Sequence, residues 1–130
     1  MKLWTSLLVV AVLCTGCGKT DPAKTAPKSD YLKLVGKWLR PDGGYVVEIK
    51  SVAADGKMEA AYFNPNPIHV SQAVASREGS IIKAFIELRD ENYPGCTYKL
   101  VYDPVGDRLT GVYFQAAQQQ FYNIEFTRTE

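Results

Sequence analysis

Hydrophobic and polar residues alternate over most of the chain from residue 31 to residue 130. Ile82, Ala84, Ile86 and Leu88, for example, are separated by single residues, two of which are charged. This two-residue period is typical of a strand with one buried face, and no helical period is sustained in the region. The pattern predicts eight strands, at residues 34–39, 45–50, 58–62, 68–76, 80–89, 97–102, 108–116 and 121–128.

Short turn-forming segments separate the predicted strands. Pro41–Gly44 and Ala54–Gly56 combine residues that favour tight turns. Asn64–Pro67 is expected to interrupt the pairing, because proline lacks the N–H group that a central strand donates. The links are too short for a crossover helix, so antiparallel pairing is expected. The sequence therefore predicts an all-β fold, an eight-stranded antiparallel up-and-down barrel, while a two-sheet sandwich fits the same alternation.

A different pattern occupies the start of the chain. A positively charged start precedes an apolar-rich stretch, residues 3–13, which has the length of a secretory signal core and is too short to span a bilayer as a helix. Two small residues directly before Cys17 resemble a bacterial lipobox, which implies a lipoprotein signal peptide at residues 1–16 and lipidation of Cys17. The position three residues upstream, usually aliphatic in that motif, is Cys14. An ordinary secretory signal with a free cysteine is the alternative.

The residues after Cys17 are polar and include two prolines but no bulky apolar residue. Such a segment cannot bury enough surface to offset its ordering entropy, so residues 17–30 are predicted to be a lipidated cysteine with a flexible tether, and residues 31–130 the barrel domain. Because two or more acyl chains hold a protein stably on a membrane, we expect a lipid-anchored protein of the cell envelope. Gly18 lacks the charge that retains lipoproteins in the inner membrane, which favours the outer membrane in a Gram-negative host.

Charge adds little to this picture. Fifteen Lys and Arg residues against fourteen Asp and Glu residues leave a formal net charge of +1. A nearly neutral chain provides no electrostatic footprint for nucleic acid. The partners expected are the membrane, through the lipid anchor, and a small-molecule ligand, and the sequence leaves the oligomeric state open.

Residues that commonly carry catalysis are sparse. His69 is the only histidine, and the chain lacks the sequence motifs of serine hydrolases, zinc peptidases and redox dithiols. With Cys17 lipidated and Cys14 removed, Cys96 is the remaining thiol. We therefore expect a non-catalytic protein with no metal site and no cofactor.

The segment Leu34–Trp38, which reads Leu-Val-Gly-Lys-Trp, resembles the Gly-x-Trp start of the calycin superfamily, which includes lipocalins and avidins. The resemblance implies a small barrel whose structural signature is Gly36, Trp38 and Arg128, with the arginine from the last strand packed across the tryptophan at the closed end. It does not extend to biotin binding, because avidin sites use several tryptophans as walls and Trp38 is the only one after the leader.

Tyrosine is the most informative residue type that remains, with eight in the chain. Placing the apolar positions inward puts several tyrosines on the interior face by register. These candidate ligand-binding residues are Tyr45, Tyr62, Tyr98, Tyr102 and Tyr122. The side of Tyr113 stays open because Val112 and Phe114 compete for the interior, and Asn64 and Gln72 would add polar groups near one end.

Small eight-stranded barrels either fill their interior or hold one small ligand. Buried tyrosine hydroxyls need partners, which a cavity supplies as water or ligand. We therefore expect a carrier or sensor of a small amphipathic molecule. The alternatives are a filled core with tyrosine hydroxyls at its rims, and a structural or protein-interaction module that uses the outer barrel face, where Phe63, Phe85 and Phe114 are expected.

Overall fold

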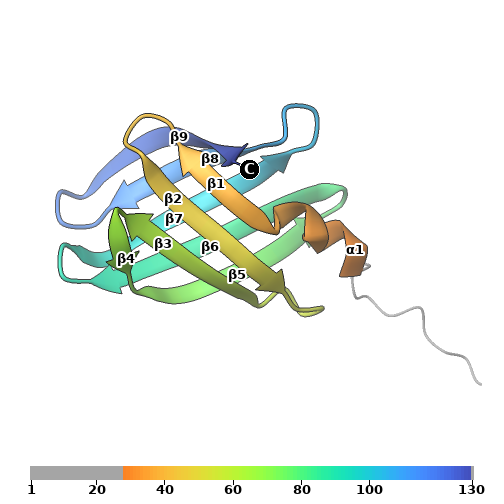
Figure 1. Ribbon diagram of the computed structural model, residues 1–130, viewed down its shortest axis with the longest axis horizontal. Helices are drawn as coiled ribbons and strands as arrows, with labels where there is room; N and C mark the ends of the chain where they lie inside the picture. The colour runs from red at the N-terminus through yellow and green to blue at the C-terminus, as the bar shows by residue number, and fades with distance from the viewer. Residues whose placement is uncertain (1–27, 130) are drawn as a thin grey trace, which may run out of the picture.

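A computed structural model describes residues 28–129, which form one antiparallel sheet curled into a nearly closed barrel (Figure 1). The predicted signal peptide, Cys17 and the tether as far as residue 27 lie outside the described residues. The prediction of an all-β antiparallel barrel is confirmed, and the single continuous sheet replaces the alternative of two packed sheets.

Nine strands make up the sheet. They are β1 (Gly36–Arg40), β2 (Tyr45–Val52), β3 (Met58–Asn64), β4 (Asn66–Ile68), β5 (Val70–Glu78), β6 (Ile81–Asp90), β7 (Tyr93–Asp103), β8 (Arg108–Gln115) and β9 (Gln120–Thr129). Their order in the sheet is β4-β3-β2-β1-β9-β8-β7-β6-β5. Because β1 pairs with both β2 and β9, the first and last strands meet and the meander curls round on itself.

The count of nine instead of eight comes from an interruption at His69. This single residue separates β4, which pairs with β3, from β5, which pairs with β6. The two segments form one bent pass of the chain, and an isolated bridge between Lys57 and Val74 joins this pass to the start of β3 again. The sequence predicted that Asn64–Pro67 interrupts the pairing; the chain does turn at Pro65, between β3 and β4, but Pro67 lies within β4 and pairs with Phe63. Proline is tolerated there because β4 has only β3 as a ladder neighbour among the described strands.

The chain enters the barrel through two short helical turns, α1 (Lys28–Tyr31) and the 3₁₀ turn η1 (Leu32–Leu34). Residues 28–30, assigned to the tether from sequence, therefore belong to α1, and the first strand begins at Gly36 instead of residue 34. The reason is burial: Tyr31 and Leu34 turn into the barrel and are 7% and 0% exposed. None of the described helical segments is long and apolar enough to cross a bilayer.

Side chains fill the barrel from this helical end to its middle. Paired residues on neighbouring strands face the same side of the sheet, so Trp38 and Val47 both point inward, as do Ile86 and Tyr98. The largest fully buried side chains are Trp38, Tyr62, Tyr98, Phe126, Leu34, Ile49, Ile86, Leu88, Leu100, Leu109, Val47 and Cys96. Each large apolar side chain buried in this way contributes roughly 1.5–3 kcal/mol. Most of the interior is therefore occupied by protein.

Candidate functional site: a tyrosine-lined cavity at the open end

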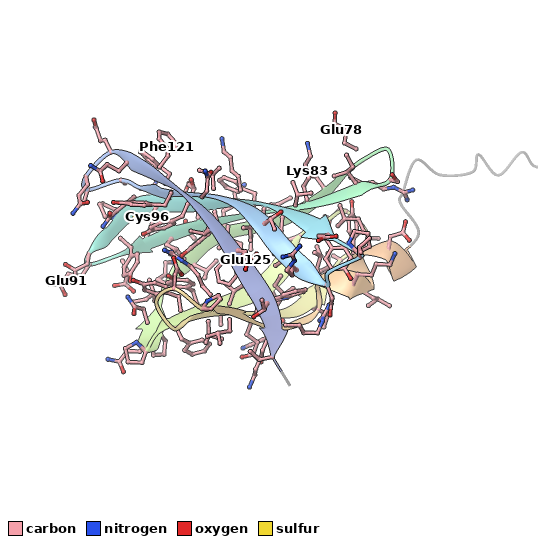
Figure 2. The ribbon with its side chains drawn as sticks, turned by 90° about the horizontal axis from the view of Figure 1, so that it is seen from above. Glu78, Lys83, Glu91, Cys96, Phe121 and Glu125 are labelled. Atoms are coloured by element: carbon pink, nitrogen blue, oxygen red, sulfur yellow. The ribbon has the colours of Figure 1, made fainter. Side chains whose placement is uncertain are left out.

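The two ends of the barrel differ. One end, which we call the closed end, is covered by α1 and η1, and Arg77 at the end of β5 pairs there with Asp30 at 2.6 Å. The opposite end, the open end, is ringed by the β1–β2, β3–β4, β6–β7 and β8–β9 turns (Figure 1). Figure 2 shows Glu91 and Phe121 at the open end, and Glu78 on the side of α1.

A cavity of about 400 Å³ lies at the open end. It is lined by Arg40, Tyr45, Tyr62, Asn64, Asn92, Tyr93, Tyr113, Gln115 and Tyr122. Five of these nine residues are tyrosines, three carry neutral amides, one is an arginine and none is a carboxylate. The volume falls in the range of small-molecule sites, and the lining combines ring faces with hydrogen-bonding groups.

Arg40 brings a positive charge into this cavity. It follows Trp38 by two residues on β1, so it also points inward, and it is 9% exposed. Its guanidinium donates from Nε and Nη2 to the Asp42 carboxylate, at 2.6 and 2.9 Å, and from Nη1 to the Tyr98 hydroxyl at 3.0 Å. Burial by itself lowers the pKa of Arg40, but the bonds to Asp42 and Tyr98 outweigh that effect and raise it. Arg40 therefore stays charged.

A chain of hydrogen bonds runs from Arg40 through the Tyr98 hydroxyl to Tyr62, and the two hydroxyl oxygens lie 3.0 Å apart. A guanidinium only donates, so the Tyr98 oxygen accepts from Arg40. Either hydroxyl can donate in the bond between Tyr98 and Tyr62, and the proton of the other hydroxyl is then left for a further acceptor. Burial raises the pKa of both tyrosines, so both hydroxyls keep their protons at neutral pH.

Two pairs of rings, which we call the tyrosine walls, flank the Arg40 side chain. Tyr45 stacks on Tyr62 with 10° between the ring planes, and Tyr113 stacks on Tyr122 with 27°. The guanidinium carbon of Arg40 lies 4.7 Å from the Tyr45 centroid and 5.3 Å from the Tyr113 centroid, within range of cation–π attraction. A planar group therefore already occupies part of the layer between the walls.

The β3 and β7 sides of the cavity are linked at its rim. Asn64, the last residue of β3, donates its side-chain amide to the hydroxyl of Tyr93, the first residue of β7. The Tyr93 ring also contacts Tyr62 edge to face, with centroids 6.0 Å apart. This link sets the position of Tyr93, whose hydroxyl proton remains available because its oxygen accepts from Asn64.

The candidate ligand-binding residues predicted from sequence divide into four groups. Those that line the cavity are Tyr45, Tyr62, Asn64 and Tyr122. Tyr98 lies behind the lining, fully buried, and acts on the cavity through Arg40 and Tyr62. Tyr102 lies at the closed end, where it donates to Asp107 at 3.0 Å.

Gln72 is exposed and belongs to a groove on the barrel wall between β3 and β5, so the structure does not bring it to the open-end cavity with the other candidates. The physical reason is register. Ala73 and Ala75 take the inward positions of β5, and the register of β5 against β6 shifts between Val70 and Gln72. The side chain of Gln72 consequently lies outside.

Sequence reasoning missed several lining residues, namely Arg40, Asn92, Tyr93, Tyr113 and Gln115. Arg40 shares the inward parity of Trp38 and was detectable from that signal. Tyr93 lies between the strands predicted at residues 80–89 and 97–102, although in the structure it begins β7. The sequence left open which side Tyr113 faces, and in the structure it faces the interior and is 8% exposed.

The closed end carries the contact that the calycin resemblance implies. The guanidinium of Arg128 lies over the Trp38 ring, 4.2 Å from its centroid, and donates to the Val35 and Lys33 carbonyls at 2.8 and 2.6 Å. Gly36 makes room for it, because a Cβ at this position would lie 2.7 Å from Nη1 of Arg128, and its φ of +140° disfavours other residues. These contacts seal the closed end.

The outer face differs from the expected phenylalanine patch. Phe63, Phe85 and Phe114 are half-buried on β3, β6 and β8, which are not neighbours in the sheet. Phe114 instead packs against Phe121 on β9, with centroids 4.8 Å apart, and Phe121 is 72% exposed. The exposed aromatic surface on this face, at the open end, is therefore the Phe121 ring packed on Phe114.

His69 and the acidic residues do not assemble a metal site in the part of the chain that the structure describes. At the β4–β5 junction the His69 N–H donates to the Asp90 carboxylate at 2.8 Å, and the His69 carbonyl accepts from the N–H of Arg89 at 3.0 Å. These backbone bonds hold the bend between the two strands against β6.

The fold and the cavity together define a small meander barrel with a closed end and a tyrosine-lined cavity at its open end. Comparison with protein-family models, curated proteins and solved structures finds no match for this chain.

Proposed function

We propose that this chain is a lipid-anchored envelope lipoprotein whose barrel binds one small amphipathic molecule, as a carrier or sensor and without catalysing a reaction. The observation that supports binding is the cavity of about 400 Å³, which combines two tyrosine walls with hydroxyl, amide and guanidinium groups. Ring faces would hold the apolar part of a ligand, and the polar groups would orient the remainder.

The position of α1 supports the anchoring part of the proposal. α1 begins at Lys28 at the closed end, so the preceding chain joins the barrel opposite the cavity. A lipid on Cys17 would leave the cavity open to the aqueous side. Replacement of Cys17 by Ala should move the protein from the membrane fraction to the soluble fraction, whereas Cys14→Ala should leave it on the membrane. A Cys17→Ala protein that stays membrane-bound would overturn the anchor.

Native mass spectrometry of the detergent-solubilised protein, purified from its own host, tests the binding part. We expect a complex that retains one small molecule. The Tyr62→Phe variant should retain it about fivefold more weakly, since a lost hydrogen bond costs about 1 kcal/mol. Tyr102→Phe is the matched control, because Tyr102 lies at the closed end and should not affect binding. An empty protein, or equal losses in the two variants, would contradict the proposal.

The exposed ring of Phe121, packed on the half-buried Phe114, supports a second candidate, a protein-interaction module. An empty cavity together with a concentration-dependent dimer that Phe121→Ser abolishes would favour this reading. A monomer that retains a ligand would exclude it.

A further inference from the structure

We infer that the ligand of the open-end cavity is a planar conjugated carboxylate, such as an aromatic acid, whose carboxylate binds Arg40 while its ring lies between the tyrosine walls. This inference rests on the proposed binding function and adds the chemical class of the ligand.

The first argument is charge. Arg40 lines the cavity, its side chain is 11% exposed, and none of the nine lining residues carries a negative charge to balance it there. Its counterion, Asp42, lies on the β1–β2 turn with a side chain 55% exposed. Water screens the charge of Asp42 far more than that of Arg40. Among the nine lining residues the one formal charge is thus the positive charge of Arg40, which favours an anion.

The second argument is the supply of free donors. A guanidinium has five N–H groups, of which Asp42 takes two and Tyr98 takes one. One N–H therefore remains on each terminal nitrogen of Arg40. The hydroxyl proton of Tyr93 also lacks an acceptor among the bonds described above, as does one of the two hydroxyl protons of the Tyr62–Tyr98 pair. A carboxylate supplies two oxygens that accept several such bonds, which are stronger when they are charge-assisted.

The third argument is shape. The flat guanidinium of Arg40 lies between the rings of Tyr45 and Tyr113, which shows that the space between the walls accepts a planar group. A conjugated ring continuing this layer would contact aromatic faces on both sides, an arrangement that stabilises flat rings more than puckered ones. Guanidinium and carboxylate would then lie edge to edge in the same layer.

Asp42 is already a carboxylate bound to Arg40, so it shows that the guanidinium binds this kind of group. Because it is attached to the protein and bound at two points, it also competes for the positive charge. Removing this negative charge at an exposed turn should strengthen the binding of an external carboxylate. The prediction separates an anion-binding cavity from one in which the Arg40–Asp42 pair serves stability alone.

Isothermal titration of the detergent-solubilised full-length protein with three matched probes tests the inference. Benzoate is planar and anionic, benzamide is planar and neutral, and cyclohexanecarboxylate is anionic and puckered. We expect benzoate to bind roughly tenfold more tightly than either of the others, which corresponds to one charge-assisted contact or one stacking contact. Asp42→Asn should tighten benzoate severalfold and leave benzamide unchanged. Arg40→Gln, where it folds, should abolish the preference for benzoate over benzamide.

Equal binding of benzoate and benzamide, equal binding of the two acids, or an Asp42→Asn protein with unchanged benzoate affinity would each overturn the ligand class. Failure of all three probes to bind at millimolar concentration would do the same. A neutral molecule retained in native mass spectrometry would leave the binding function standing and show that only the class is wrong. A barrel that is empty when purified and binds none of the probes would overturn both.

Discussion

Arg128 on β9 is directly paired with Trp38 on β1, and its guanidinium lies over the indole ring. This contact connects the first strand of the barrel to the last. The indole Nε1 of Trp38 donates to the Leu34 carbonyl at 2.8 Å, so the same pair also holds η1 against the barrel. This pair of side chains therefore contributes both to the junction of the first and last strands and to the coverage of the closed end.

Replacing Arg128 by Gln should lower the free energy of unfolding by about 1–2 kcal/mol, because the cation–π contact and the hydrogen bonds to the Val35 and Lys33 carbonyls are lost. Arg89→Gln is the matched control: Arg89 is 64% exposed and pairs with Glu87 at the surface, where such pairs contribute less than about 1 kcal/mol. Urea unfolding measures both. Equal losses would show that Arg128 is an ordinary surface charge.

Acid should weaken the closed end through Asp107. The Arg128 guanidinium holds the pKa of the Asp107 carboxyl below the ordinary value of an aspartate. The unfolded chain therefore binds a proton at Asp107 more readily, and the stabilisation, present above about pH 4, is lost as pH falls through the lower folded-state pKa. We expect Asp107→Asn to reduce the dependence of stability on pH in this range, measured by urea unfolding at a series of pH values. An unchanged slope would contradict this role.

Alkali should unfold the barrel through its buried tyrosines. Burial raises the pKa of Tyr62, Tyr98 and Tyr113 above the ordinary value of a tyrosine. Both states keep these protons below about pH 10, but above it the unfolded chain loses them first, so stability falls as pH rises. Tyrosinate absorbance should show exposed tyrosines ionising first and these three only with unfolding, followed by circular dichroism. Full ionisation while the strand signal persists would show that the three rings are accessible to water.

Gly111 should be irreplaceable for a steric reason. A Cβ at Gly111 on β8 would lie 1.9 Å from the carbonyl oxygen of Lys99 on the paired strand β7. We expect Gly111→Ala to lower the free energy of unfolding by about 3 kcal/mol or more. At Gly79, with a φ of +61° and open space around it, Ala should cost about 1 kcal/mol. Thermal unfolding compares the two, and a smaller loss at Gly111 would show that the strands separate easily.

The sequence alone determined which face points inward for most strands, because side chains alternate along a strand, although it left the side of Tyr113 open. Alternation placed Tyr45, Tyr62, Tyr98 and Tyr122 inside. The contact of Arg128 with Trp38 was instead what the calycin resemblance implies. Alternation did not anticipate Gln72, where a local shift in register puts the side chain outside.

The tertiary structure decided how far along the barrel each inward residue lies. Tyr98 and Tyr102 share a strand and a face, yet Tyr98 supports the cavity and Tyr102 bonds Asp107 at the closed end. Alternation fixes the direction in which a side chain points. Its position along the barrel axis and the residues it contacts depend on the register between strands that are distant in sequence. The contact of Arg40 with Tyr98, 58 residues away, exists because closure of the sheet brings β1 and β7 together across the interior.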